Sequence, residues 1–293
     1  MDPEEISDHP ISRPWPLTSG PIPGGEDLPA LLGLALSIAA EAAALARATR
    51  EKALTEISTK SSATDVVTAA DKAGERLIRE RLAIARPGDP IVGEEGGEQD
   101  AVPGTVRWIL DPIDGTVNYV YGVPYYAVAI AAERDGRLLV GVVHNIADGT
   151  VWHAAAGLGA YRNGEPVHCG SPTDLSWALI ATGFGYDKEV RRWQGEILAA
   201  VIPEVRDIRR MGSAAIDLCL LAEGVLDGYY ERGPHLWDYA AGGLIAAEAG
   251  AVVSGLYREA PEIGMTLAAA PGVYPAPRAL LQSRIPDTES TEG

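Results

Sequence analysis

Apolar residues recur with helical spacing in two segments near the start of the chain. The first, residues 31–54, is rich in Ala and Leu and contains no proline, so it predicts a long helix. The second runs from Thr68 to Ala85 and is followed by Arg86-Pro87-Gly88, a sequence that ends helices. Positions 71, 78 and 82 share one face of this helix, which places Asp71 at the edge of an apolar stripe.

Strand patterns dominate the next part of the chain, and recognisable turns connect some of them. Asp135-Gly136 and Asn163-Gly164 are both typical of hairpins. The predicted strands form a largely antiparallel meander: residues 91–92, 106–110, 126–133, 138–145, 151–155 and 159–162. This part of the chain therefore predicts an α+β architecture.

After a change in composition around Gly170–Asp174, strand and helix patterns alternate. The predicted strands are residues 178–182, 205–209, 228–231 and 251–253. The predicted helices between them are residues 189–201, 214–222 and 239–249. Alternation of this kind predicts an α/β architecture.

The segments at the two ends of the chain differ from the rest in composition. Residues 1–29 are rich in Pro, Asp, Glu and Gly and are expected to be a disordered leader, and residues 286–293 to be a flexible tail. Between them we expect an N-terminal α+β part at 30–175 and a C-terminal α/β part at 176–285.

Composition narrows the classes of function. The 293 residues are 46% hydrophobic, enough for a sizeable core, and their formal net charge is −17. Such a charge repels phosphate backbones, so nucleic-acid binding is not expected to be the main activity. The acidity is typical of a well-solvated surface, and it is also compatible with carboxylates that hold cations. Net charge alone does not separate these two interpretations.

The spacing of the cysteines and the length of the apolar runs indicate in which cellular compartment the protein is found. Cys169 and Cys219 show no CxxC spacing and suggest no disulfide framework, which favours a reducing cytoplasm. No run approaches the roughly 18–20 apolar residues of a membrane span. The N-terminus lacks the basic and apolar regions of a signal peptide. We therefore expect a cytoplasmic protein without a membrane partner.

Candidate chemistry begins at Asp111-Pro112-Ile113-Asp114, directly after an apolar strand. Pro112 disfavours helical geometry at Asp111, so the chain turns and gathers two carboxylates and the Ile113 carbonyl around one point. Gly115-Thr116 then opens a short helix, whose free N–H groups can bind an anion. Metal-assisted phosphoryl hydrolysis requires cation ligands beside a phosphate site. An isolated turn of this kind is nevertheless often purely structural.

Three further carboxylates are candidates for the same site. Glu94 follows a buried strand in the loop Gly93–Gly97, which suits a hard cation but equally suits a solvated acidic loop. Asp71 is costly on an apolar face unless a cation or donors meet it, although it can also serve only the helix dipole. Asp238 is placed as the N-cap of the helix at 239–249 and could direct its second oxygen into a site.

Two other positions are candidates for contacts to a ligand. In Gly212-Ser213-Ala214-Ala215, Ser213 is a plausible N-cap and Gly212 lets a ligand approach the backbone. Glu231 ends a strand shortly before Gly233-Pro234. Both features could be purely structural. The histidines and cysteines show no metal-ligand spacing: His144, His153, His168, His235, Cys169 and Cys219.

Taken together, these stretches resemble the inositol monophosphatase family, within the magnesium-dependent, lithium-sensitive phosphatases. The resemblance covers about residues 30–275 in family order, and Trp108–Asn118 with Trp237–Gly250 is its most specific part. Composition and the segment Arg209–Gly250 are similar to those of an actinobacterial member. The other matching stretches are Asp65–Asp71, Gly93–Glu95 and Gly212–Ala215.

The resemblance implies a layered αβαβα fold, usually dimeric, with Mg²⁺ as cofactor. It implies one magnesium on Glu94, Asp111 and the Ile113 carbonyl, and a second on Asp111, Asp114 and Asp238. Glu94, with Asp71 acting through water, would support a third ion.

The implied reaction is hydrolysis of a small polyol monophosphate by a metal-activated water, with inositol monophosphate as the leading candidate. Thr116 and Asp71 would position and deprotonate the water, and the Gly115 and Thr116 amides would bind phosphate. The implied contacts to the polyol hydroxyls are Gly212, Ser213, Ala214 and Glu231, with Asp238 near the leaving oxygen.

Some alternatives stay open. Gly96 stands where Ser is common in the family, and Ala251 replaces the second glycine of the usual Glu-Ala-Gly-Gly. Histidinol phosphate, a nucleotide 3′-phosphate, NADP and fructose bisphosphate are other candidate substrates. A regulatory partnership with the transcription machinery, as in some bacterial relatives, is a hypothesis of a different class. Magnesium binding without catalysis is a third.

Overall fold

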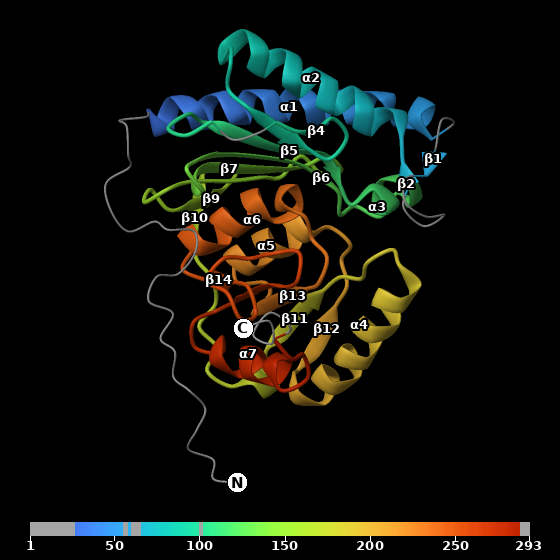
Figure 1. The fold of residues 1–293 in the computed structure, drawn as a ribbon, viewed down its shortest axis with the longest axis vertical. Coiled ribbons are helices and arrows are strands. Elements are labelled where there is room, and N and C mark those ends of the chain that lie inside the picture. Colours follow the sequence, from blue (N-terminus) through green and yellow to red (C-terminus); the bar gives the residue numbers. More distant parts are fainter. Residues whose placement is uncertain (1–26, 55–57, 60–65, 100–101, 288–293) are drawn as a thin grey trace.

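The computed structural model describes residues 27–54, 58–59, 66–99 and 102–287. Its elements stack in five layers, in the order helix, sheet, helix, sheet, helix (Figure 1). The layered αβαβα fold predicted from the sequence is therefore confirmed. The predicted leader and tail lie outside the described residues, apart from residues 27–29 and 286–287.

Two long helices, α1 (Leu28–Ala53) and α2 (Ala69–Ala85), form the first layer (Figure 1). Helix α1 begins earlier than predicted because Asp27 caps it: the Asp27 carboxylate accepts a hydrogen bond from the Ala30 N–H at 3.1 Å. Pro29 is tolerated in the first turn, where its missing N–H would have no helical partner.

Helix α1 also corrects an expectation about apolar runs. Its 26 residues contain an 18-residue window of mean hydropathy 1.9, so by length and composition it could cross a membrane. In the structure this apolarity serves the core, because Ala35, Ala39 and Ala43 are buried against the larger sheet and α2. A helix made of Ala and Leu reaches high hydropathy even when it packs on a sheet as this one does.

The larger sheet has eight strands in the order β10-β9-β8-β7-β6-β5-β3-β4. Only the pair β3 and β5 is parallel, and the other neighbouring strands are antiparallel. The predicted hairpin turns are confirmed, because Asp135 and Asn163 both have φ of 51° and are each followed by a glycine of positive φ. The strands are β3 (Ile91–Gly93), β4 (Gly97–Glu98), β5 (Arg107–Asp114), β6 (Ala127–Arg134), β7 (Arg137–Asn145), β8 (Val151–Ala155), β9 (Ala160–Arg162) and β10 (Glu165–Val167). A separate small sheet pairs β1 (Ser58–Thr59) with β2 (Val66–Val67).

Strand β5 continues past Leu110, where the sequence predicted its end. Asp111 pairs with Ala129 of β6 and Asp114 with Ala127, so three steps along β5 match two along β6. This irregularity lies between Asp111 and Asp114 and has the residue count of a β-bulge, and it includes Pro112, which cannot donate to the sheet ladder. Residues three apart in a regular strand face opposite sides of the sheet. The bulge removes that alternation and lets Asp111 and Asp114 face the same side.

The smaller sheet has five strands in the order β12-β11-β13-β15-β14. Strand β11 runs parallel to β12 and β13, whereas β15 is antiparallel to both its neighbours. The smaller sheet therefore contains both parallel and antiparallel pairs. Between β14 and β15 the chain reverses direction without a helix, so strands and helices do not alternate throughout this part of the chain. The strands are β11 (Leu179–Thr182), β12 (Asp207–Arg209), β13 (Gly228–Glu231), β14 (Val252–Ser254) and β15 (Thr266–Ala269).

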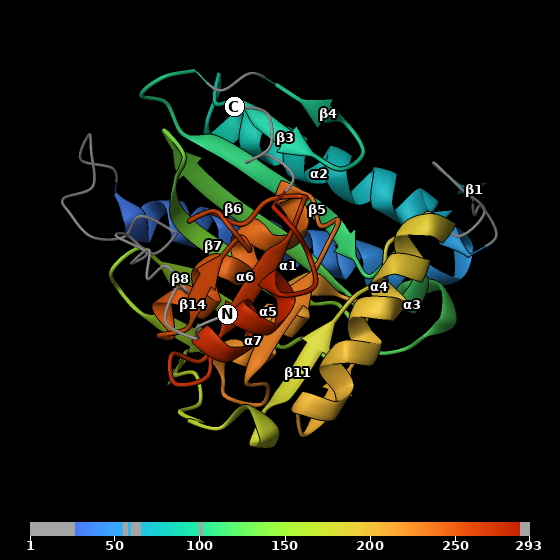
Figure 2. The ribbon, with the colours of Figure 1, turned by 60° about the horizontal axis from the view of Figure 1, so that its bottom comes forward.

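The remaining helices complete the layers. Helices α5 (Ala214–Ala222) and α6 (Leu236–Glu248) lie between the two sheets (Figure 1). Helices α4 (Lys188–Val201) and α7 (Pro275–Gln282) cover the outer face of the smaller sheet (Figure 1, Figure 2). Shorter elements are α3 (Thr116–Tyr121) and the 3₁₀ turns η1 (Leu175–Trp177) and η2 (Ile202–Glu204).

Two glycines allow the middle layer to pack closely. A Cβ at Gly242 of α6 would lie 2.9 Å from the Ala215 carbonyl oxygen of α5. A Cβ at Gly141 of β7 would lie 2.8 Å from the Ala241 carbonyl oxygen of α6. Because both positions lack a side chain, α6 lies directly against α5 and against the larger sheet. The first turns of α5 and α6 are thereby held next to the end of β5.

Candidate active site

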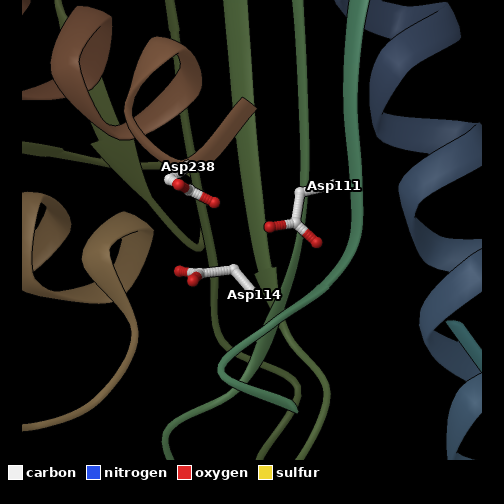
Figure 3. A group of neighbouring side chains, drawn as sticks. All are labelled: Asp111, Asp114 and Asp238. Carbon is white, nitrogen blue, oxygen red and sulfur yellow. The ribbon is translucent and has the colours of Figure 1, made fainter. Parts of the chain in front are cut away.

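Three aspartates meet where β5 ends and α6 begins. One carboxylate oxygen from each of Asp111, Asp114 and Asp238 can be chosen so that all three lie within 4.8 Å of one another. Figure 3 shows the three side chains next to one another, Asp111 and Asp114 from β5 and Asp238 from α6. Asp111 is only 1% exposed and Asp114 8% exposed, whereas Asp238 is partly exposed, so two of the three carboxylates are withdrawn from water.

Hydrogen bonds fix the two β5 aspartates. The Ile113 N–H donates to Asp111 Oδ1 at 2.9 Å. Asp114 Oδ2 accepts hydrogen bonds from the Ser213 hydroxyl at 2.5 Å and from the Ala215 N–H at 2.8 Å. Ser213 is the N-cap of α5, as predicted, and its hydroxyl also accepts from the Ile216 N–H. The start of α5 therefore anchors Asp114 and leaves its other oxygen to face the cluster.

A hydrogen bond at the start of α6 fixes the Asp238 carboxylate. The sequence predicted Asp238 as an N-cap, which is wrong: α6 begins at Leu236, so His235 is the N-cap and Asp238 is the third residue of the helix. From there Asp238 Oδ2 accepts a hydrogen bond from the His235 N–H at 2.6 Å. One oxygen thus serves the helix terminus while the carboxylate still contributes to the group of three.

Asp71 has the same relation to α2 and lies beside the cluster. It is the third residue of α2, and Asp71 Oδ2 accepts from the Thr68 N–H at 2.8 Å and from the Thr68 hydroxyl at 2.5 Å. Its other oxygen, Oδ1, lies 3.1 Å from the Thr116 hydroxyl. Thr116 Oγ1 is also 3.1 Å from the Ile113 carbonyl oxygen. A hydroxyl has one proton, so Thr116 can donate to only one of these acceptors at a time.

Glu94 lies close to the three aspartates but outside their group. It belongs to the turn between β3 and β4 and is partly exposed. Burial is the main cause of the raised pKa values of Asp71, Asp111, Asp114 and Asp238, and the negative charge of Glu94 raises each of them further. The sequence-predicted carboxylates therefore all gather at one place, with three in mutual contact range and Glu94 and Asp71 at the edges.

The electrostatics of this cluster fit a divalent cation. Burial raises the pKa of Asp111 well above its usual range, and the next largest influences, from Glu94, Asp114 and Asp238, raise it further. Burial also raises the pKa of Asp71 and of Asp114 to about 6. Buried like charges are unfavourable unless positive charge compensates them. Oxygen-only donors are those that hard cations such as Mg²⁺ prefer.

These shifts predict how stability depends on pH when no metal is bound. The pKa of Asp71 and of Asp114 is about 6 in the folded chain, against 3.8 for an ordinary Asp. The folded chain holds these protons more tightly than the unfolded chain, so this stabilisation is complete below pH about 4 and is lost as the pH rises through about 6. Thermal unfolding in EDTA should therefore show Tm falling by several degrees between pH 5 and pH 7.5.

Two histidines change the stability with pH in the opposite direction. A reference variant is therefore needed to isolate the contribution of the carboxylates. Burial lowers the pKa of His144 and of His153. The Asp111→Asn variant keeps both histidines but removes one clustered charge, and its Tm should fall less over the same pH range. A Tm in EDTA that rises with pH, or an equal slope in the variant, would contradict this electrostatic description.

The backbone at Gly115, at the edge of the aspartate cluster, packs closely against a neighbouring segment. Gly115 has φ of 90° and precedes α3. A Cβ there would lie 2.8 Å from the Tyr125 carbonyl oxygen and 3.0 Å from the Gly212 carbonyl oxygen. Gly115 is therefore required both for its conformation and for space, and the Gly212–Ala214 segment lies directly against it.

Glu231 lies at the end of β13 near this segment. The Tyr229 hydroxyl donates to Glu231 Oε2 at 2.8 Å, and burial raises the pKa of Glu231 to about 7. A side chain at Gly183 would collide with the Glu231 carboxylate, so the loop that starts at Gly183 lies against it. Asp114 also raises the pKa of Glu231, which places Glu231 within electrostatic reach of the aspartates.

Three residues that shape the site were not predicted. The Asn118 amide donates to the carbonyls of Tyr125 at 2.7 Å and Met211 at 2.8 Å, and so joins α3 to the segment before Gly212. Gln194 accepts from the Gly185 N–H and donates to the Arg232 carbonyl, both at 2.9 Å, and so holds the 183–187 loop near Glu231.

Asp217 is the third residue that was not predicted. It is 2% exposed, and its Oδ1 has no hydrogen-bond partner within the described part of the chain. Its pKa is raised well above the usual range by burial and by Glu231. The sequence signals for Asn118 and Gln194 were weak, because their partners lie in other elements. Asp217 gives no capping or spacing signal within its helix.

Comparison with known proteins shows which family and which solved structure this chain is similar to. The sequence profile of the inositol monophosphatase family matches residues 27–292. The inositol-1-monophosphatase of Mycobacterium bovis is 49% identical over 270 residues, which cover 86% of this chain and 93% of that protein. The Nus factor SuhB of Escherichia coli is 38% identical over 191 residues, 65% of this chain and 72% of that protein. The solved structure of Mycobacterium tuberculosis SuhB has a TM-score of 0.76 at 46% identity, covering 89% of this chain and 98% of that one.

Proposed function

Because this chain belongs to the inositol monophosphatase family, we propose that it hydrolyses myo-inositol monophosphate to inositol and phosphate, with Mg²⁺ as its cofactor. The chain is a phosphoric monoester hydrolase by its family. The observation that carries the proposal is the group of Asp111, Asp114 and Asp238, placed next to the Thr116–Asp71 contact.

The acidic residues would hold the metal. Asp111, Asp114 and Asp238 would bind at the centre, and Glu94 and the Ile113 carbonyl would complete the ligand set from the edge. Bound Mg²⁺ supplies positive charge that offsets the charge of the phosphate and of the leaving oxygen. The hydrogen bonds from Ile113, Ser213 and Ala215 orient two of these carboxylates before any ion arrives.

Other residues of the chain would act on the water and the phosphate. Asp71 Oδ1 would accept a proton from the attacking water, and the Thr116 hydroxyl, 3.1 Å away, would orient that water. The N–H groups of Gly115 and Thr116, at the start of α3, would bind the phosphate oxygens. Burial of Asp71 excludes bulk water from this step.

The polyol would lie between the Gly212–Ala214 segment and Glu231. Glu231 can accept hydrogen bonds from hydroxyl groups, and the Tyr229 hydroxyl keeps its carboxylate in place. A flat base would need a stacking surface or a base-edge partner. The residues at this position are a segment of small residues, Gly212–Ala214, and the Glu231 carboxylate, which favours a polyol. Asp238 would lie near the leaving oxygen.

A comparison of substrates tests this specificity. Phosphate release should be measured at fixed Mg²⁺ for inositol 1-phosphate, histidinol phosphate, a nucleotide 3′-phosphate, NADP and fructose 1,6-bisphosphate. We expect the highest kcat/KM for inositol 1-phosphate, and Glu231→Gln should raise KM for it while changing kcat less. A clear preference of the wild-type enzyme for histidinol phosphate would contradict the assignment of the substrate.

Relatives that are named Nus factor SuhB support a second candidate function, participation in transcription. Its test is whether an inactive Asp111→Asn protein replaces the wild type in the host cell. Full replacement would favour the regulatory function over the phosphatase. We also expect the protein to be cytoplasmic and to form a homodimer. Light scattering of the purified protein can check the dimer.

A further inference from the structure

The turn that carries Glu94 is held by two side chains of α2. The turn comprises Glu94, Glu95 and Gly96 between β3 and β4. Its backbone donates twice to Glu75: the Glu95 N–H to Oε2 at 2.7 Å and the Gly96 N–H to Oε1 at 2.8 Å. Glu75 lies one helical turn after Asp71, on the same face of α2. One face of this helix therefore reaches both the Thr116 hydroxyl and the Glu94 turn.

Arg79 completes this attachment. Its Nε lies 2.6 Å from Glu75 Oε1, and its second guanidinium nitrogen donates to the Gly97 carbonyl at 3.0 Å. Glu75 is 2% exposed, so its carboxylate is buried but accepts two N–H groups and one guanidinium. Charge-assisted hydrogen bonds of this kind are stronger than neutral ones and hold their partners in a defined geometry.

Gly93, the last residue of β3, and Gly96 of the turn provide the space that Glu75 occupies. A Cβ at Gly93 would lie 2.7 Å from Glu75 Oε1, and one at Gly96 would lie 2.5 Å from the same atom. Gly96 would also approach Arg79 Nε to 2.7 Å. Neither glycine has a positive φ, so a side chain at either position would displace the Glu75 carboxylate and would not strain the backbone.

We propose that Glu75, supported by Arg79, is a positioning residue that fixes the Glu94 turn at the metal cluster. The proposal rests on the proposed function, in which Glu94 is a metal ligand. Glu94 lies at the edge of the cluster and not within the group of three aspartates. Its contribution to metal binding therefore depends on where the turn is held. Glu75 binds the backbone of the turn, Arg79 binds the Gly97 carbonyl directly after it, and the pairing of β3 with β4 closes it.

The test compares Glu75→Gln with a matched control, Glu80→Gln. Glu80 lies on the same helix and is exposed, so the control makes the same chemical change away from the turn. In Glu75→Gln the amide group faces an N–H donor and the pair with Arg79 loses its charge. Residues that orient metal ligands typically contribute about 10–100-fold to metal affinity. We expect the Mg²⁺ concentration for half-maximal phosphate release to rise about tenfold, with kcat recovering at saturating Mg²⁺ and KM for substrate unchanged.

A second readout needs no substrate. The rise of Tm with added Mg²⁺ should shift to higher concentration in Glu75→Gln by the same factor, and Glu80→Gln should follow the wild type. A purely structural role for Glu75 would lower Tm in EDTA without moving the Mg²⁺ midpoint of either titration. Unchanged midpoints would therefore overturn the proposal.

Two other variants keep the proposal testable if Glu75→Gln does not fold. Arg79→Gln removes the contact to Gly97, and Gly96→Ala adds a methyl group against Glu75 without altering the allowed φ. Both should raise the Mg²⁺ midpoint, and wild-type midpoints in both would overturn the proposal. If the wild type itself neither releases phosphate nor responds to Mg²⁺, the proposed function fails and this inference fails with it. If the wild type responds and the variants match it, only this inference fails.

Discussion

Replacing Asp111 by Asn is expected to reduce kcat about a thousandfold or more, because a loss of about 4 kcal/mol of transition-state stabilisation corresponds to that factor. Asp111 is the most deeply buried of the three clustered aspartates, and the surrounding carboxylates all raise its pKa. An amide keeps the shape of the side chain and its hydrogen bond from the Ile113 N–H, but it removes a negative charge that the cation requires. Phosphate release at saturating substrate and Mg²⁺ measures the loss.

The same variant should remain folded, and in EDTA it should be at least as stable as the wild type. Removing one of several buried like charges relieves repulsion when no cation is present. Added Mg²⁺ should then raise its Tm much less than that of the wild type. Asp174→Asn, an exposed cap outside the cluster, is the matched control and should behave as the wild type. Near-normal activity of Asp111→Asn would refute the assignment of the metal site.

The second large effect is expected at Thr116. Thr116→Val removes the hydroxyl that faces Asp71 Oδ1 and keeps nearly the same volume. A positioned proton-transfer group contributes about 10²–10⁴-fold to a rate. We expect kcat to fall by about two to three orders of magnitude, while the Mg²⁺ midpoint of the thermal shift changes little because Thr116 is not among the clustered carboxylates.

Asp71 and Thr116 should behave as one unit. The double variant Asp71→Asn with Thr116→Val should lose little more activity than the less active single variant, because both substitutions impair the same step, the activation of the attacking water. Thr49→Val is the control, since its hydroxyl donates to the Leu45 carbonyl within α1 and not to a residue of the aspartate cluster. Multiplicative losses in the double variant would show that the two residues act separately.

The local parts of this site could be predicted from the sequence. Asp71 on an apolar face, the Asp111–Asp114 turn and Ser213 at a helix start all depend on neighbours within a few residues. Spacing and capping rules reach that far. Asp238 shows their precision, because it does contribute to the start of α6, but as the third helical residue and not as the cap.

The other parts depend on contacts between distant segments. The bulge between Asp111 and Asp114 appears only in the register of β5 against β6, and it lets these two residues face the same side. Glu75 reaches a backbone 20 residues away and Asn118 one 93 residues away. No periodicity in the sequence reports such pairs. The insertion of β15 between β13 and β14 is likewise a property of the sheet and not of the local pattern.

The most direct test of the central claim is phosphate release from inositol 1-phosphate by the purified protein, before and after removal of divalent cations. We predict turnover in Mg²⁺, its loss in EDTA, and its return when Mg²⁺ is restored in excess. Turnover that persists unchanged in EDTA, or no release of phosphate at any Mg²⁺ concentration, would contradict the function proposed for the aspartate cluster.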